Sequence, residues 1–543
     1  MGEANGRLFF TTNTSGSFSF YQPDGIWSTD GTRPGTIKLR DIDRSFSPFY
    51  YPNNFPEPNK YCFVNDRLVF SVKEAGNNWS LWSSDGSVNG TIRMKDFADS
   101  LLNLSFGQPK PVLLNGSAFF FTVSAAGNVL VWKTDGTAAG TLVVKNILPS
   151  DILNASKGIP SAVVSLNGHI YFNCLTNDST AVLWKTDGTN AGTVPVFAFH
   201  SDEAYIFVPA LGTIGNQLLL QGYDSENGYE LWASDGTTSG TRLLKEINPG
   251  KIYPHINSFT NAGNKTFFIA SDIVHGTELW ITDGTATGTK MVKDICPGTT
   301  GTGVYMISGV SGTKVLFTGS DVPGRYGKVC ISDGTEEGTF VLPNTSVSLM
   351  TGPEPRQYRY ISSVVIDGKF YFQNFKDDIT TESEIWVTDG TVAGTKPFMS
   401  KDNIYVMHSL GHPFPLAYYN KKIYFCGINI PVTGNSPEGF EPYYTDDCVC
   451  PESGRPELFV NLFPNPSAGK VFIDLVSLQL TSYTKADLVI YDAAGRRVKT
   501  QSLALDQNCK RIEFNTYSLS QGTYIAYLVI GKEKIAKKFI IAR

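Results

Sequence analysis

The sequence lacks the features that mark several large classes of protein. No apolar run is long enough to cross a bilayer as a helix. The formal net charge of -5 leaves no basic footprint for nucleic acid and no polybasic segment for a membrane surface. No window shows the 3.6-residue apolar period of an amphipathic helix, which excludes a helical solenoid. We therefore expect a chain of strands with no nucleic-acid partner and no transmembrane segment.

The motifs of common catalytic and metal sites are missing as well. No CxxC pair occurs among the 8 cysteines, so neither a zinc ribbon nor a thioredoxin-like site is indicated. HExxH and GxSxG are absent, and nothing supports zinc hydrolysis or a serine nucleophile. Cys448 and Cys450 flank a single valine and are expected to form a local disulfide or to remain free thiols. We assign no catalytic residue, no metal ligand and no cofactor.

What is present is a phrase that occurs eight times. It reads LWASDGTTSGT at residues 231–241 and LWITDGTATGT at residues 279–289. A period of roughly 50 residues indicates supersecondary units that stack or are arranged radially. The aspartates of the phrase are Asp30, Asp85, Asp135, Asp187, Asp235, Asp283, Asp333 and Asp389.

One repeat predicts four short strands. In residues 161–199 an apolar run ends at Asn167-Gly168, a dipeptide typical of tight hairpin turns. Strands are expected at 169–174, with largely alternating apolar residues, at 181–185 and, after the Asp-Gly turn, at 193–199. The first hairpin recurs nine times, and the ninth copy has a degenerate third strand. Repeated four-stranded sheets are typical of propeller blades. We predict an all-β fold with a large β-propeller of nine or eight four-stranded blades.

We interpret the repeated side chains as structural residues of the fold. A tryptophan three residues before the aspartate is expected to fill the wedge between neighbouring blades, although a ladder of sugar-stacking platforms is an alternative. Each aspartate is expected to accept backbone N–H groups across its own turn. Eight identical carboxylates around a ring would not converge on one substrate, and one carboxylate per turn does not suit calcium. The predicted blade-core residues are Trp27, Trp82, Trp132, Trp184, Trp232, Trp280 and Trp386, with Cys330 in the seventh copy and Tyr443 in the ninth.

These repeats resemble the ELWxxDGT family, which is found in secreted bacterial proteins and is expected to form propellers. The fullest copies are ELWASDGTTSGT at residues 230–241 and ELWITDGTATGT at residues 278–289, whereas the leading glutamate is missing from several others. The resemblance covers residues 6–447 and implies little about activity.

The period stops after residues 448–459, CVCPESGRPELF. Residues 459–543 are expected to form a small immunoglobulin-like β-sandwich. Three phrases, FPNPSAGKVFIDL, IYDAAGRRVKT and LSQGTYIAYLVIGKEKIAKKFII, together resemble the type A sorting domain of the type IX secretion system of Bacteroidetes-type bacteria. An ordinary accessory domain is the alternative. The resemblance implies handling by the type IX machinery, then release or attachment at the outer membrane. We expect a propeller over 1–450, a linker over 451–458 and the sorting domain over 459–543.

The first residues, MGEANGRLFF, carry no apolar core of a signal peptide. Type IX cargo is expected to carry an export signal, so we expect that the chain starts after cleavage, or that its start is truncated or engineered.

Ligand sites usually lie on loops that a rigid scaffold holds. In an up-and-down blade, the two tight turns share one face and the variable connections share the other. Residues 43–60 and 352–360 combine aromatic residues with proline or arginine, and residues 428–441 form a long insert. Aromatic rings could stack on sugars, and arginines could hold carboxylates. The candidate ligand-binding residues are Tyr50, Tyr51, Phe55, Arg356, Tyr358 and Arg359.

We therefore expect an exported cell-surface or extracellular propeller that acts as a binding and adhesion module for a glycan or a protein. The alternatives are a secreted propeller enzyme acting on polysaccharide, a hydrolase or lyase, and a purely structural surface-layer component. An enzyme predicts unlike ionisable residues clustered at the mouth of the central channel. A binding module predicts exposed aromatic residues and carboxylates with ordinary pKa values.

Overall fold

The computed structural model of the chain describes most of the repeats and part of the C-terminal region. All regular elements within these residues are strands. The part of the chain so described holds no helix that is long and apolar enough to span a membrane. The described residues are 2–12, 25–32, 34–41, 61–73, 79–97, 112–124, 128–148, 160, 162–175, 180–200, 211–298, 304–322, 327–347, 361–375, 382–398, 406–407, 416–419, 422–427, 441–446, 459–463, 470–476, 485–492, 496–504, 511–530 and 533–541.

The chain divides into two compact units. The first contains Met1–Phe398 and Tyr405–Tyr444, and the second contains Met399–Ile404 and Thr445–Arg543. In the described residues, the first unit consists of successive antiparallel sheets. Seven of them have four strands in chain order, the eighth has a fifth strand because β33 pairs with β31, and the ninth has three strands.

The strand bounds follow the repeat closely. The first four sheets contain β1 (Gly2–Ala4), β2 (Arg7–Thr12), β3 (Gly25–Thr29), β4 (Ile37–Asp41), β5 (Tyr61–Val64), β6 (Arg67–Lys73), β7 (Trp79–Ser84), β8 (Ile92–Phe97), β9 (Leu113–Leu114), β10 (Ser117–Val123), β11 (Val129–Thr134), β12 (Leu142–Ile147), β13 (Val163–Leu166), β14 (His169–Leu175), β15 (Thr180–Thr186) and β16 (Val194–His200). The next five contain β17 (Leu211–Ile214), β18 (Gln217–Asp224), β19 (Gly228–Ser234), β20 (Arg242–Lys245), β21 (Asn257–Ala262), β22 (Lys265–Asp272), β23 (Gly276–Thr282), β24 (Lys290–Lys293), β25 (Val304–Ser311), β26 (Lys314–Gly319), β27 (Lys328–Ser332), β28 (Phe340–Val341), β29 (Ser363–Ile366), β30 (Lys369–Phe375), β31 (Glu382–Thr388), β32 (Lys396–Pro397), β33 (Val406–Met407), β34 (Ala417–Tyr419), β35 (Lys422–Gly427) and β36 (Glu441–Asp446).

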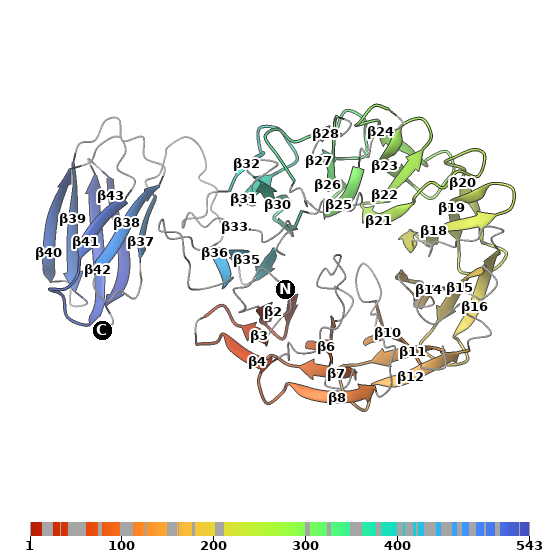
Figure 1. The fold of residues 1–543 in the computed structure, drawn as a ribbon, viewed down its shortest axis with the longest axis horizontal. Helices are drawn as coiled ribbons and strands as arrows, with labels where there is room; N and C mark the ends of the chain where they lie inside the picture. The colour runs from red at the N-terminus through yellow and green to blue at the C-terminus, as the bar shows by residue number, and fades with distance from the viewer. Residues whose placement is uncertain are drawn as a thin grey trace. The chain divides into compact units, whose positions relative to one another are not determined.

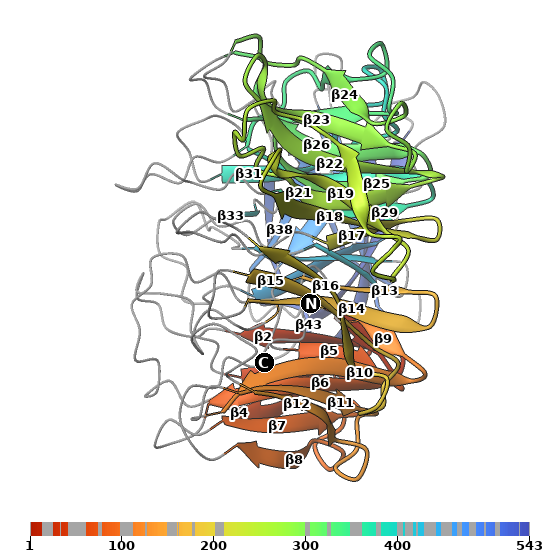
Figure 2. The ribbon, with the colours of Figure 1, turned by 90° about the vertical axis from the view of Figure 1, so that its right-hand side faces the viewer.

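The sheets of the first unit follow one another around a common centre (Figure 1). First strands of successive sheets contact each other, as β17 contacts β21 and β21 contacts β25, while the fourth strands β8, β12 and β16 lie on the outside. The view turned by 90° shows the sheets side by side (Figure 2). The first sheet also meets the ninth, because Leu8 clusters with Tyr419 and Tyr424 and the Tyr419 hydroxyl donates a hydrogen bond to Gly6 O. These four-stranded sheets are consistent with the predicted propeller.

The hydrophobic core lies between successive sheets. One cluster joins Phe119 and Phe121 of β10 to Phe172 of β14 in the next sheet. Consequently the middle strands bury both faces. Residues 170–174 are all buried, so the expected alternation of apolar and polar residues over 169–174 is wrong. The sequence of a strand that is covered on both faces is a nearly continuous run of apolar residues.

The second unit is also built from strands. One sheet has the order β37-β38-β41 and the other the order β40-β39-β42-β43. Leu488, Phe514 and Leu528 are among its buried residues, and β37 contacts β43. The strands are β37 (Phe459–Phe463), β38 (Lys470–Val476), β39 (Lys485–Asp492), β40 (Arg497–Ala504), β41 (Arg511–Asn515), β42 (Gly522–Ile530) and β43 (Glu533–Ile541).

Candidate functional site

Each repeated aspartate lies in a closed hydrogen-bonded turn between the third and fourth strands. Asp235 Oδ1 accepts hydrogen bonds from the Thr237 N–H (2.9 Å) and the Thr237 hydroxyl (2.6 Å). The Thr237 hydroxyl in turn accepts the Gly240 N–H at 3.0 Å, and the Thr241 hydroxyl donates to Thr237 O at 2.8 Å. The same pair of bonds to the aspartate occurs at Asp30, Asp85, Asp135, Asp187, Asp283, Asp333 and Asp389.

The two glycines of the turn have different tasks. Gly236 has a φ of 86°, a conformation that side-chain-bearing residues rarely adopt. Gly240 is needed for space, because a Cβ atom at this position would overlap the Asp235 carboxylate. The hydrogen bonds from Thr237 hold the pKa of Asp235 below its ordinary value. The aspartates are therefore ionised acceptors that organise their own turns.

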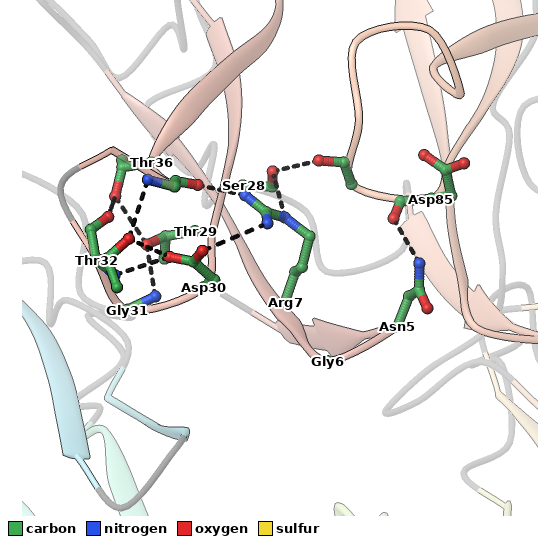
Figure 3. Close-up of polar contacts among 12 residues, drawn as sticks. Asn5, Gly6, Arg7, Ser28, Thr29, Asp30, Gly31, Thr32, Thr36 and Asp85 are labelled. Atoms are coloured by element: carbon green, nitrogen blue, oxygen red, sulfur yellow. Dashed lines mark hydrogen bonds and ion pairs between the residues drawn. The ribbon is translucent and has the colours of Figure 1, made fainter.

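The Asp-Gly turn of one sheet contacts the Asn-Gly-type turn of the sheet before it. The Asn5 side chain donates to Asp85 O at 3.0 Å, and Ser28 Oγ donates to Gly86 O at 2.7 Å (Figure 3). Asn65 donates to Asp135 O in the same way at the next boundary. These two kinds of turn thus share one face of the ring, which we call the turn face. The face carrying the other connections is called the loop face.

An arginine ties the first turn to its own sheet. Arg7 Nε donates to Ser28 Oγ at 3.0 Å, and the Arg7 guanidinium also donates to Gly35 O (Figure 3). Arg7 Nη1 lies 4.0 Å from Asp30 Oδ2. Arg67 repeats the arrangement with Ser83 and Gly90 in the second sheet. In the first two sheets these polar groups of the turn face are therefore bonded to one another.

Six of the repeated tryptophans, all except Trp27, lie at joints between sheets. The Trp132 ring meets Phe97 of the preceding sheet edge to face, with ring centroids 5.4 Å apart, and Cys330 takes the same place in the seventh sheet, fully buried. The pairing register shifts just before the tryptophan in six sheets, so a β-bulge sets its direction. Trp27 and Trp82 are only half-buried, and the Arg40 guanidinium lies 3.7 Å from the centre of the Trp82 ring. Buried tryptophans are Trp132, Trp184, Trp232, Trp280 and Trp386.

The candidate ligand-binding residues lie outside the described part of the chain: Tyr50, Tyr51, Phe55, Arg356, Tyr358 and Arg359. So do Cys448 and Cys450, and the side chain of Tyr443. Four cysteines are free and buried, and burial raises the pKa of each thiol: Cys62, Cys174, Cys296 and Cys330. Among the described residues, no three His, Cys, Asp or Glu side chains are placed to hold a metal ion.

Sequence reasoning missed two buried glutamates. Glu230 in β19 is fully buried, and its carboxylate accepts the N–H groups of Ile247 (2.6 Å) and Asn248 (2.8 Å). Glu278 in β23 is equally buried and accepts the Cys296 N–H at 3.1 Å. Burial raises the pKa of both carboxyls to about 7. The sequence feature that could have identified these two residues was the leading glutamate of the two fullest repeats. Two shifted carboxylates were not expected of a binding module, but both are buried and bonded to backbone N–H groups.

A row of aromatic rings was missed as well. Tyr223, Tyr229, Tyr253 and His255 follow one another with edge-to-face contacts, at centroid distances of 4.9 Å, 5.3 Å and 4.4 Å. Tyr223 and Tyr229 are buried, Tyr253 is half-buried and His255 is exposed. No repeat carries this pattern, because the rings come from three different segments of the chain.

Comparison with known families identifies the C-terminal region. The family model described as "Secretion system C-terminal sorting domain" matches residues 461–542. This match confirms the predicted type IX sorting domain. The protein is accordingly secreted and attached at the cell surface, and the tail is handled by the type IX machinery. No curated protein matches the chain.

Several solved structures are similar to parts of the chain at low identity. Sqt1 of Saccharomyces cerevisiae is 10% identical, with a TM-score of 0.40, over 72% of this chain and 95% of that chain. The β-propeller domain of the Trilobed protease from Pyrococcus furiosus is 12% identical, with a TM-score of 0.33, over 71% and 94%. Prolyl oligopeptidase B from Galerina marginata is 11% identical, with a TM-score of 0.37, over 68% and 55%. The strand pairing of the chain itself defines its fold.

Proposed function

We propose that this exported protein is a surface-displayed propeller of nine blades that binds a glycan or a surface protein through its loop face. The observation that carries the proposal is the contrast between the two faces. The turn face repeats the same self-satisfied hydrogen-bond network from sheet to sheet, whereas the connections on the other face differ in length and sequence. Variable loops on a rigid scaffold are where binding sites usually lie.

Nine blades are supported by the seam between the first and ninth sheets. Leu8, Tyr419 and Tyr424 pack together there, and β1 pairs with β2 of its own sheet, so no strand is exchanged between the ends. For the tail, two facing sheets support an immunoglobulin-like sandwich. We keep residues 451–458 as the linker between a propeller over 1–450 and the sorting domain over 459–543.

The inner strands favour a binding module over an enzyme. In their described residues, the first strands β1, β5, β9, β13, β17, β21, β25, β29 and β34 carry one carboxylate, Glu3, and no histidine, lysine or arginine. Catalysis on polysaccharide needs unlike ionisable groups that converge on one point. The eight turn aspartates do not supply them, because each is directed into its own turn. We propose that they are structural, as are the repeated tryptophans.

A glycan array probed with the full chain, run beside an activity screen on polysaccharides, tests this function. Saturable binding without new reducing or unsaturated ends would support it. Depolymerisation of any polysaccharide would instead indicate a hydrolase or lyase. Arg356→Ala and Tyr358→Ala probe the proposed contact loop, and Arg93→Ala, an exposed arginine of an outer strand, is the matched control. Loss of binding in the control alone would place the contact away from the loop face.

A further inference from the structure

We propose that the connection between β20 and β21, residues 246–256, forms a binding site for an uncharged saccharide chain, with Tyr253 and His255 as its contact residues. This inference rests on the proposed function, because it names a site and a ligand class on the loop face. The connection joins the fifth and sixth sheets and is described over its whole length.

The start of the connection is held from below by a buried carboxylate. Glu230 accepts the N–H groups of Ile247 and Asn248. The Asn248 side chain then bonds to the hairpin of the sixth sheet, donating to Ser271 O at 2.7 Å and accepting the Ile273 N–H at 3.0 Å. Two sheets are thereby locked to the same few residues of backbone.

The end of the connection is held by an amide. Gln221 of β18 donates through Nε2 to the Tyr253 hydroxyl at 3.0 Å, and its Oε1 accepts the Ile256 N–H at 3.1 Å. Between these points, Pro254 O accepts the Ser271 N–H at 2.7 Å. The Tyr253 ring therefore has a fixed position, and it would not have to be ordered when a ligand binds.

The backbone of this segment is locally strained. Lys251, His255 and Ser258 have φ values of 66°, 49° and 58°, within eight residues of one another. Residues other than glycine, asparagine and aspartate adopt this conformation at a cost, and such strain persists where the surroundings determine the conformation. Gly228 provides the room, because a Cβ atom there would come within 2.8 Å of Lys251 Cα. The connection is a preorganised structure that turns His255 outward.

The row of aromatic rings determines what kind of ligand surface the site can contact. It runs from Tyr223, which is buried and whose hydroxyl has no hydrogen-bond partner, through Tyr229 and Tyr253 to the exposed His255. Ile252 beside it is 46% exposed. Partly exposed rings offer apolar area to the C–H face of a sugar at little entropic cost, since they are already held in place.

The polar groups around the rings match hydroxyls. An amide group both donates and accepts hydrogen bonds, as a sugar hydroxyl does. Asn257, whose side chain donates to His255 O at 2.8 Å, adds a fixed amide at the same place. The carboxylate of Glu230 is buried beneath the backbone and cannot meet a ligand. Within the connection itself, the exposed side chains of Glu246 and Lys251 carry opposite charges, so the segment has no net charge. We therefore assign the site to neutral sugars.

Isothermal titration of the full chain with cellohexaose, xylohexaose, maltohexaose and chitohexaose, and with a galacturonate oligomer as the acidic arm, tests the assignment. His255→Asn removes the ring, and asparagine tolerates the left-handed backbone, so folding is preserved. The matched control is His169→Asn, since His169 also lies beside a tyrosine, Tyr171, but on the turn face. We expect one neutral oligosaccharide to bind, with at least a tenfold loss of affinity in His255→Asn and less than a twofold change in the control.

Four results would overturn the inference. Binding of a neutral sugar that His255→Asn leaves unchanged would place the glycan site elsewhere on the loop face, and the proposed function would stand. Binding of the galacturonate oligomer alone would contradict the ligand class. If the chain bound a surface protein and no saccharide, the proposed saccharide site would be wrong, but the proposed binding function would stand. If the chain bound neither a protein nor a saccharide, the site and the function would both be wrong.

Discussion

Gly240 lies directly against the carboxylate of Asp235, five residues earlier in the chain, and leaves no room for a side chain. The second glycine of the repeat is therefore a steric partner of the aspartate. We predict that Gly240→Ala costs about 1–3 kcal/mol of unfolding free energy through overpacking. Asp235→Ala should also destabilise the turn, because Thr237 loses its acceptor. The double variant should lose less than the sum of the two, since the clash is gone. Urea titrations of all three measure this coupling. Strict additivity would show that the two residues act independently.

The buried glutamates predict how stability depends on pH. Burial raises the pKa of Glu230 from 4.5 to about 7, so the folded state keeps a proton that the unfolded state releases. The stability from this group is complete below pH 4.5 and is lost as pH rises toward 7, at a slope of up to ~1.4 kcal/mol per pH unit. Glu230→Gln should reduce the slope of the unfolding free energy between pH 5 and 7, as measured by denaturant titration, and the remaining slope should come from Glu278, whose pKa is also about 7. An unchanged slope in the variant would mean that Glu230 is ionised throughout.

Much of the repeat could be predicted from the sequence because it depends on local chemistry. Asn167-Gly168 and the Asp-Gly pairs require particular backbone conformations, and they fixed the strands to within a residue or so. The alternation predicted for 169–174 failed because residues from two neighbouring sheets cover that strand on both faces. Burial of that kind is a property of the assembled ring.

The missed sites depend on contacts between distant segments. The aromatic row takes Tyr223, Tyr229 and Tyr253 from two strands and a connection, and nothing in a linear pattern aligns them. Glu230 was visible as the leading residue of a full repeat, but its role depends on its two backbone partners, Ile247 and Asn248, which lie in the next connection. The seam between the first and ninth sheets likewise joins Leu8 to Tyr419, more than four hundred residues apart.

The tryptophans should differ in importance according to their burial. Trp280 is buried, whereas Trp82 is half-exposed beneath the Arg40 guanidinium. We predict that Trp280→Ala lowers the unfolding free energy by about 3–5 kcal/mol and that Trp82→Ala costs clearly less. Chemical denaturation followed by circular dichroism compares the two. If Trp280→Ala retained full stability but abolished glycan binding, the tryptophans would be sugar platforms, the alternative that their regular spacing left open.

The seam, where the first and ninth sheets meet, differs from the other boundaries between sheets. Leu8 packs against Tyr419 and Tyr424 across it, and Leu68, at the same position of the second sheet, packs in the cluster between the first two sheets. Both Leu8→Ala and Leu68→Ala should cost about 2–5 kcal/mol, because each leaves a cavity. Their effects on shape should differ. The chain continues across the Leu68 boundary, whereas in the described residues the seam has side-chain contacts and no shared strand.

Small-angle X-ray scattering should therefore show an increased radius of gyration for Leu8→Ala and an unchanged one for Leu68→Ala. Tyr419→Phe should weaken the seam by about 1 kcal/mol, because it removes the hydrogen bond to Gly6 O. A greater expansion in Leu68→Ala than in Leu8→Ala would mean that the ring is held closed elsewhere. Equal, unchanged radii at the predicted loss of stability would mean that the nine sheets unfold as one unit, with no weak point at the seam.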